Sequence, residues 1–522
     1  MGERFTDFAA RLPARWRDDL RAFALWAAVA AVAIAAASGY ALTHEPQRAQ
    51  AAPPAAKPAK HRRHRYRPAR MRVRRRIAHR RVRPEARLER DAAAGLSHVL
   101  FTRSPGGAIA TAARTARYRG LIERAARGSG FSPSLLEGMV FLESAGYADA
   151  IAGSDPVAAS GLTQIVAQTG ASFLHMRVDL RRSRRLTRLI HRAEARGKLR
   201  RAARFAAIRR RVDRRFDPAD ALAGTVRYLE AARRYLGRDD LAVASYHMGI
   251  GNLQGVVARW ARVSLRVPTT RVVRNDRLSY AKLFFTSAPD RHPEAWARLN
   301  ALADDTRNYY WKVLAAERIM WLYRHNPRLL GEQAWLQAQK FSAEEVLHPR
   351  TRTTRFARPR DLVRAWRRAE LVGLRGSSAR THLAISPHVG QMARRLKRPR
   401  RLYQGLRPGV MEVLLYIGRR VHQLSGARRP LLVTSEVRDV RYQGLLERVN
   451  ANAARSYSLH TTGYAFDLAR SYGSRRQAAA LQFVLDRLEA LNLIAYIKEQ
   501  TAIHVAVASG AAHRLRMLRA DA

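Results

Sequence analysis

The hydrophobic pattern changes several times along the chain. Residues 23–42 (FALWAAVAAVAIAAASGYAL) form an uncharged apolar run that is long enough to span a bilayer. Residues 44–116 show no sustained apolar period, which predicts a disordered or extended tether. From about 118 to 341 apolar residues recur at helical spacing. After about 384 the pattern predicts a helix over 410–424 and strands at 431–436, 494–499 and 502–507.

A chain of 522 residues is too long for one hydrophobic core. We therefore predict a multidomain protein with a mostly α domain followed by a small α+β domain. The expected segments are an N-terminal anchor or signal (1–43), a basic linker (44–116), a helical domain (117–341) with a basic helical insert (180–215), a second linker (342–383) and the α+β domain (384–522).

The charges that flank the apolar run predict its orientation. Five arginines precede it, whereas only Arg48 lies between its end and Lys57. By the positive-inside rule the N-terminus stays in the cytoplasm and the rest of the chain is exported. A cleaved signal peptide is the alternative, because residues 49–51 (Ala-Gln-Ala) offer a site of small residues. Either way we expect a cell-envelope protein, anchored in the inner membrane or secreted.

The formal net charge is +56, which predicts binding to polyanions. The expected partners are anionic envelope polymers or lipids. Nucleic acid is a rival suggested by charge alone; the apolar export segment and the sparse aromatics speak against it, since Tyr66 is the only aromatic residue of the basic stretch 61–84. Cysteine is absent, so a metal site must use histidine and carboxylate ligands.

The stretch FSPSLLEGMVFLESAG (131–146) contains a candidate acid. Ser132 and Pro133 are typical of a helix start. On the helix that follows, Glu143 shares one face with apolar residues at positions 136, 139 and 140. Desolvation raises the pKa of such a carboxyl, as the protonation of a glycosidic oxygen requires. The alternative is an ordinary capping or surface residue.

Further short motifs follow Glu143 in order. They are GLTQI (161–165), FDP (216–218), ASYHMGIGN (244–252) and DTRNYYWKV (305–313). With the Glu-Ser pair at 143–144, this series resembles the lytic transglycosylases of the soluble-lysozyme type over about 118–325. The resemblance implies a lysozyme-like, mostly helical fold that acts on peptidoglycan.

The resemblance also implies roles for single residues. Glu143 matches the one catalytic acid/base of the family, and the positions that match substrate contacts are Ser144, Gln164, Tyr246 and Tyr309. A scaffold role is the alternative for Gln164 and Tyr309. Three positions depart from the family pattern and put the finer sugar contacts in doubt: Thr163, His247 and Met248.

A single carboxyl limits the chemistry. Two-carboxylate glycosidases need a second acidic residue as base or nucleophile, and none stands out in the matched motifs. The resemblance implies that Glu143 protonates the leaving oxygen and then accepts the proton of the C6 hydroxyl of N-acetylmuramic acid, which closes a 1,6-anhydro ring. Hydrolysis by water, as in a lysozyme, is the alternative.

The C-terminal part contains a candidate metal site. In SLHTTGYAFDLA (458–469), His460 and Asp467 lie seven residues apart, and His504 lies within a predicted strand. The motif resembles that of the zinc D-Ala-D-Ala carboxypeptidases over about 400–510. The resemblance implies one Zn²⁺ held by His460, Asp467 and His504, with the fourth position left open as in catalytic zinc sites.

The same resemblance suggests further residues of this site. Arg438 and Gln443, in the upstream segment TSEVRDVRYQ, match positions that bind substrate, although a plain salt bridge is the alternative for Arg438. Glu499 is the nearest acid before His504, but it lies five residues away rather than the family's three, which puts its role as general base in doubt. Val437 replaces the aromatic residue of the family motif.

We therefore expect a peptidoglycan-remodelling enzyme that combines a lytic transglycosylase with a zinc peptidase acting on stem peptides. Two alternatives stay open. In the first alternative, the C-terminal domain binds peptidoglycan without cleaving it. In the second, the whole protein is a non-enzymatic cell-wall-binding protein.

Overall fold

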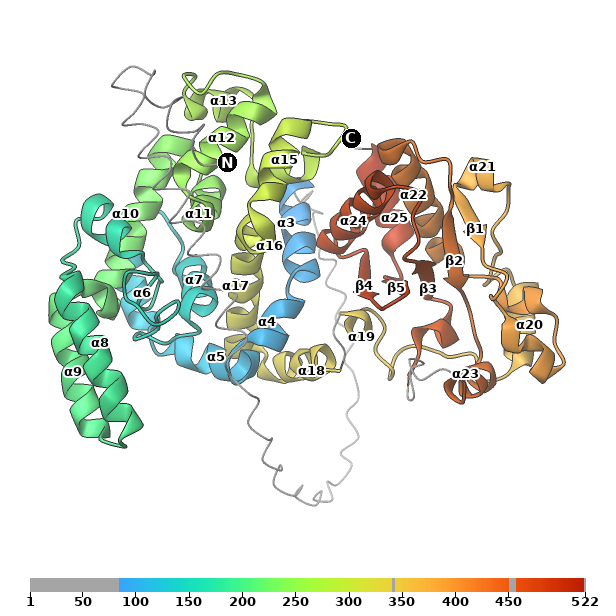
Figure 1. Ribbon diagram of the computed structural model, residues 1–522, viewed down its shortest axis with the longest axis horizontal. Helices are drawn as coiled ribbons and strands as arrows, with labels where there is room; N and C mark the ends of the chain where they lie inside the picture. The colour runs from blue at the N-terminus through green and yellow to red at the C-terminus, as the bar shows by residue number, and fades with distance from the viewer. Residues whose placement is uncertain (1–83, 340–342, 450–456, 521–522) are drawn as a thin grey trace, which may run out of the picture.

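The computed structural model describes residues 84–339, 343–449 and 457–520. The described chain is mostly helical, with a small mixed sheet in its C-terminal part (Figure 1). This confirms the expectation of a mostly α part followed by an α+β part. Within these ranges no helix is long and apolar enough to cross a membrane. The apolar run 23–42 lies outside the described residues, as does the tether up to residue 83.

The helical part begins at Pro84 and ends at Gln337. Its α-helices are α3 (Pro84–Gly95), α4 (His98–Arg103), α5 (Gly107–Ala116), α6 (Arg119–Ala126), α7 (Pro133–Ser144), α8 (Leu180–Ala195), α9 (Leu199–Val212), α10 (Pro218–Leu236), α11 (Asp239–Met248), α12 (Ile250–Ala261), α13 (Thr269–Asn275), α14 (Tyr280–Thr286), α15 (Pro293–Ala301), α16 (Ala303–Arg307), α17 (Tyr309–His325) and α18 (Pro327–Gln337). A π-helical turn η1 (Thr169–Phe173) and a 3₁₀ turn η2 (Arg214–Phe216) lie among them.

Helix α17 runs through the middle of this part and packs closely against α7. Trp311 and Val313 on α17 are fully buried, as is Met139 on α7. Gly138 permits the close approach, because a Cβ at this position would lie 2.8 Å from the carbonyl oxygen of Val313. The crossing brings the C-terminal end of α7 next to the start of α17.

The basic insert expected at 180–215 is a helical hairpin of α8 and α9 (Figure 1). Its inner face is apolar and includes Leu186, Ile190 and Ala202, while most of its arginines are exposed. The spacing of apolar residues therefore predicted this element correctly. In the view of Figure 1 the hairpin projects from the side of the molecule opposite the sheet.

The C-terminal part is built on five strands in the order β1-β2-β3-β5-β4. The pair β1–β2 is parallel and the other pairs are antiparallel. The strands are β1 (Leu383–Ile385), β2 (Leu431–Ser435), β3 (Ala465–Ala469), β4 (Ile494–Lys498) and β5 (Ala502–Val507). The predicted strands at 431–436, 494–499 and 502–507 correspond to β2, β4 and β5, whereas β1 and β3 were not predicted.

Helices α22 (Pro408–Ser425) and α24 (Arg475–Ala490) form an apolar core with the sheet, and α22 matches the helix predicted over 410–424. The remaining elements are α19 (Glu344–Leu347), α20 (Pro359–Arg367), α21 (Ser378–Thr381), α23 (Val440–Glu447), α25 (Ala511–Ala520) and the 3₁₀ turns η3 (Gln391–Leu396), η4 (Arg400–Tyr403) and η5 (Leu459–Thr462).

The structure differs from the expected linkers. Residues 84–116 form α3, α4 and α5, and Leu88 on α3 packs against the cores of both parts. The described residues 343–383 contain α19, α20 and α21, and Leu362 on α20 is fully buried. These helices are short, between 4 and 12 residues, and their charged residues interrupt the apolar spacing, so the sequence pattern did not reveal them.

Arginine contacts also join the two parts. Arg487 on α24 donates to the carbonyl oxygens of Phe284 (2.7 Å) and Ser287 (2.9 Å). Arg420 on α22 forms a bidentate pair with Asp290 at 2.6 and 2.8 Å. The described helical part and the α+β part are therefore in direct polar contact.

Candidate functional sites

The carboxyl of Glu143 lies at the C-terminal end of α7. Ser132 caps this helix by accepting a hydrogen bond from the Leu135 amide, and Pro133 is its first residue, as predicted. Glu143 is half-buried, and its Oε1 accepts a hydrogen bond of 2.6 Å from the hydroxyl of Tyr309. The structure therefore joins two motifs that lie 166 residues apart in the chain.

Burial makes Glu143 an unusually weak acid. Desolvation raises its pKa to about 7, although the hydrogen bond from Tyr309 favours the ionised form. Among the described residues, no second carboxylate contributes to this shift. A carboxyl in this state is half-protonated near neutral pH, so it can both donate and accept a proton there.

Aromatic rings surround the Glu143–Tyr309 pair. Tyr246 stacks on Tyr309 with ring centroids 6.2 Å apart and meets Tyr228 edge-on at 5.1 Å. The Tyr246 hydroxyl donates to the carbonyl oxygen of Thr163 at 2.8 Å. His247, an exposed residue, stacks on Tyr309 at 5.4 Å. The motifs that contain residues 143, 163, 246 and 309 thus converge on one place.

Two of the residues expected to contact substrate, Ser144 and Gln164, donate hydrogen bonds to nearby carbonyl oxygens. The Ser144 hydroxyl is buried and donates to the Val140 carbonyl oxygen one turn earlier in α7 (3.3 Å). The Gln164 side-chain amide donates to the carbonyl oxygens of Gly161 (2.8 Å) and Ala150 (3.3 Å). These bonds favour the scaffold alternative for Gln164, and they turn the Ser144 hydroxyl toward its own helix.

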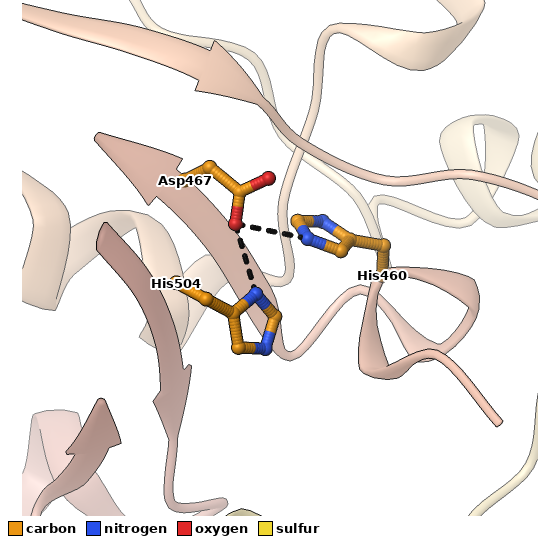
Figure 2. A group of neighbouring side chains, drawn as sticks. All are labelled: His460, Asp467 and His504. Atoms are coloured by element: carbon orange, nitrogen blue, oxygen red, sulfur yellow. Dashed lines mark hydrogen bonds and ion pairs between the residues drawn. The ribbon is translucent and has the colours of Figure 1, made fainter. Parts of the chain in front are cut away.

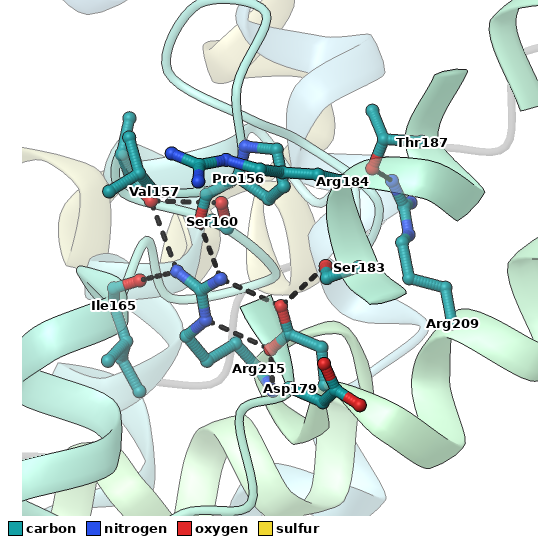
Figure 3. A network of polar contacts seen from close by, with 12 residues as sticks. Pro156, Val157, Ser160, Ile165, Asp179, Ser183, Arg184, Thr187, Arg209 and Arg215 are labelled. Atoms are coloured by element: carbon teal, nitrogen blue, oxygen red, sulfur yellow. Dashed lines mark hydrogen bonds and ion pairs between the residues drawn. The ribbon is translucent and has the colours of Figure 1, made fainter. Parts of the chain in front are cut away.

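The loop that carries Gln164 is fixed to the base of the α8–α9 hairpin (Figure 3). Arg215 is fully buried and donates to the carbonyl oxygens of Pro156 (2.6 Å), Ala158 (3.1 Å) and Ile165 (3.0 Å). Its remaining bonds go to the buried carboxylate of Asp213, at 2.9 and 2.7 Å. The hairpin base and the loop beside Glu143 are therefore one polar network.

Glycine is required where this loop crosses the hairpin base. Gly161 has φ +82°, and a Cβ there would lie 1.8 Å from the carbonyl oxygen of Arg215. No other residue fits this position without moving the backbone. The first letter of the GLTQI motif therefore has a packing reason in this chain.

The second site is the group of His460, Asp467 and His504 (Figure 2). His460 lies in η5, Asp467 on β3 and His504 on β5, where it is paired in register with Asp467. Asp467 Oδ1 lies 3.1 Å from His460 Nε2 and 2.8 Å from His504 Nδ1. One potential ligand atom from each residue lies within 4.8 Å of the others. The structure thus assembles the three residues expected to bind a metal.

The donor set fits a divalent ion such as Zn²⁺, which accepts imidazole nitrogen and carboxylate oxygen. Burial and the nearby Arg438 lower the pKa of His460 to about 4, so this ring is neutral at pH 7, as a ligand must be. Burial alone would lower the pKa of His504, but hydrogen bonds with Asp467 and Glu344 raise it to about 10. The carboxylates around His504 therefore favour a positive charge at this point.

Arg438 and Gln443 lie beside the three candidate ligands. Arg438 donates to Gln443 Oε1 (2.9 Å) and to the Ser435 hydroxyl (2.6 Å), and its guanidinium lies 3.6 Å from Asp467 Oδ2. Its backbone amide also donates to the carbonyl oxygen of His460. Arg438 therefore lies at the site, as expected, and Gln443 accepts one of the hydrogen bonds that fix its guanidinium.

A cavity of about 190 Å³ adjoins the metal candidate. Its lining includes Asp467, Arg438, Glu436 and Glu499. Glu499 is exposed at the turn between β4 and β5, and its backbone amide donates to the Ala502 carbonyl oxygen. The expected general base therefore lines the same cavity as a candidate metal ligand.

Sequence reasoning missed Glu436. It is 1% exposed, and neither carboxylate oxygen has a hydrogen-bond partner in the part of the chain that the structure describes. Burial raises its pKa to about 8. Burying a carboxyl group without a hydrogen-bond partner costs free energy. The signal in the sequence was weak, since Glu436 simply follows the apolar run of β2.

No family model matches this chain, and no curated protein matches it in sequence. The two resemblances therefore rest on the motif residues alone.

Proposed function

We propose that the protein cleaves the glycan strand of peptidoglycan at Glu143. One observation carries the proposal: a single carboxyl with its pKa raised to about 7 is held by a tyrosine among stacked aromatic rings. A proton donor poised near neutral pH is what a poor leaving oxygen requires. Exposed aromatic edges, such as that of Phe173 beside Tyr228, suit the apolar faces of sugar rings.

In the proposed reaction Glu143 protonates the glycosidic oxygen between N-acetylmuramic acid and N-acetylglucosamine. The C–O bond breaks and leaves an oxocarbenium-like centre. The carboxylate then accepts the proton of the C6 hydroxyl, whose oxygen bonds to C1 and closes the anhydro ring. Only Glu143 changes its protonation state, which agrees with the finding that no second carboxylate of the described residues contributes to its pKa shift.

Digestion of purified sacculi with product identification by mass spectrometry tests this proposal. Products with 1,6-anhydro ends support transglycosylation, whereas reducing ends support the lysozyme alternative. If sacculi stay intact with the wild-type protein, the glycan proposal fails.

We also propose a metal-dependent peptidase activity on stem peptides at the second site. The observation that favours it is the convergence of His460, Asp467 and His504 beside a cavity lined by acidic and basic side chains. A bound Zn²⁺ would supply Lewis-acid polarisation of a peptide carbonyl. Arg438 is placed to pair with a substrate carboxylate, and a carboxyl of the cavity wall is placed to move the proton to the leaving amine.

Two glutamates compete for this proton transfer. Glu499 lies in the position expected from the sequence but is exposed, whereas Glu436 is buried without a partner. The paired variants Glu499→Gln and Glu436→Gln separate them when stem-peptide cleavage and metal content are both measured. The variant that loses cleavage and keeps its metal identifies the acid. If both keep wild-type cleavage, neither residue moves the proton.

The proposed location is the cell envelope, outside the cytoplasm, with anionic envelope polymers or lipids as further partners. Support comes from the α8–α9 hairpin, whose two helices carry many exposed arginines and a single acidic residue, Glu194. Binding of this kind is electrostatic and weakens with salt. The peptidoglycan-binding and non-enzymatic alternatives predict wall retention without cleavage at one or both sites.

A further inference from the structure

A buried carboxylate outside the three candidate ligands contacts the metal site. Glu344 belongs to α19, within the stretch 342–383 that the sequence suggested to be a linker. It is 1% exposed, and its Oε2 lies 2.8 Å from His504 Nε2. The other ring nitrogen, Nδ1, lies 2.8 Å from Asp467 Oδ1. The His504 ring is therefore held between two carboxylates, one on each nitrogen.

This arrangement has a specific consequence for metal binding. An imidazole that binds a metal through one nitrogen carries a proton on the other, and an acceptor there fixes the tautomer and the ring orientation. His460 has such an acceptor as well, because its Nδ1 lies 2.9 Å from the main-chain carbonyl oxygen of Glu436. Each ring therefore turns one nitrogen toward Asp467 and has an oxygen acceptor at the other nitrogen, but only the acceptor of His504 is a carboxylate.

Contacts around His348 fix the position of Glu344. His348 follows α19 directly, and its Nε2 lies 2.6 Å from the Val507 carbonyl oxygen at the end of β5. Its ring stacks on Tyr464 at 4.1 Å, and the Tyr457 hydroxyl donates to its carbonyl oxygen. The short helix is therefore attached to the strand that carries His504 and to the segment before β3.

We propose that Glu344 is a positioning residue for the metal: it holds His504 by Nε2 and so presents Nδ1 to the ion. The inference rests on the proposed metal site. It adds that the segment between the two parts is a component of the metal centre rather than a passive connection. A C-terminal fragment that begins at residue 385 would lack this carboxylate.

The experiment compares zinc affinity in three full-length proteins: wild type, Glu344→Gln and Glu345→Gln. Glu345 is the matched control, because it is equally buried (1% exposed) but its carboxylate pairs with Arg350 at 3.7 Å instead of a histidine. Each protein is stripped with a chelator and titrated with Zn²⁺ against a chromogenic competitor. Glu344→Gln should weaken binding by about 10- to 100-fold, in the usual range for loss of a carboxylate behind a histidine ligand, and Glu345→Gln should bind like wild type.

Visible absorption of the cobalt(II)-loaded proteins gives a readout independent of activity and of overall stability. The bands should shift in Glu344→Gln and stay unchanged in Glu345→Gln. If Glu344→Gln does not fold, Glu344→Asp keeps the charge but withdraws it from Nε2, and it should also bind zinc more weakly. Wild-type affinity and spectrum in every folded Glu344 variant overturn the inference while leaving the metal site standing. A wild-type protein that binds no zinc overturns the metal site itself.

Discussion

Replacing Glu143 by glutamine should abolish glycan cleavage and at the same time stabilise the protein at high pH. The change keeps the shape of the side chain, and its carbonyl oxygen can still accept the hydrogen bond from Tyr309. It removes the acid whose position fits the reaction. Loss of a positioned general acid typically lowers the rate by at least about 100-fold.

The stability effect follows from the raised pKa. Ionisation of Glu143 is harder in the folded protein, where its pKa is about 7, than in the unfolded chain, where it is near 4.5. The ionised carboxylate therefore destabilises the fold: the penalty is absent below pH 4.5, grows as the pH rises to about 7 and then stays constant. At about 1.4 kcal/mol for each pKa unit, its full size is roughly 3 kcal/mol.

Denaturant unfolding of wild type and Glu143→Gln at pH 4.5 and pH 8 measures this effect. The variant should match wild type at the lower pH and exceed it by up to roughly 3 kcal/mol at the higher pH. Glu123→Gln is the control, because Glu123 is exposed and pairs with Arg119 at the surface of α6, where such a pair contributes less than about 1 kcal/mol. Equal stability of wild type and Glu143→Gln at pH 8 would refute the raised pKa of Glu143. Release of muropeptides by Glu143→Gln at the wild-type rate would refute its role as the acid.

Three further outcomes are expected. Tyr309→Phe removes the donor that favours ionised Glu143, so the fall of glycan cleavage with rising pH should move to higher pH in a pH–rate profile; an unmoved profile contradicts the role of this hydrogen bond. His460→Ala should abolish zinc binding by the full-length protein, measured by metal analysis after gel filtration, and zinc retained at wild-type stoichiometry would exclude this ligand. The third variant replaces four exposed arginines of α8 by glutamine: Arg181, Arg185, Arg188 and Arg192. Its binding to sacculi should depend less on salt concentration, while its cleavage of soluble glycan fragments should not change. An unchanged salt dependence of binding would exclude the hairpin as the anion-binding surface.

Most of the correctly predicted secondary structure follows from local sequence patterns. Ser132 and Pro133 start α7, and apolar spacing defines the α8–α9 hairpin and α22. These features depend on residues within one or two helical turns, so a single sequence contains them. Strand β3 was not predicted because Asp467 interrupts its short apolar sequence, AFDLA, and β1 is only three residues long.

The order of the motifs along the chain also identified most of the candidate site residues. The structure brings Glu143 to Tyr309, and it brings His460, Asp467 and His504 together. Sequence reasoning did not foresee where the Ser144 hydroxyl points. That direction depends on the rotamer, and here the hydroxyl bonds to its own helix.

By itself the sequence determined which residue types were available: an acid on an apolar helix face, and two histidines and an aspartate as candidate ligands where no cysteine exists. Only the tertiary structure decided their electrostatic state. The pKa of Glu143 depends on how closely α7 and α17 cross at Gly138, and such packing joins residues far apart in the chain. Glu344 shows this most clearly. An acidic residue in a four-residue helix is expected at the surface, whereas packing against the sheet buries Glu344 beside His504. Periodicity reports on neighbours along the chain, whereas desolvation and ligand geometry depend on neighbours in space.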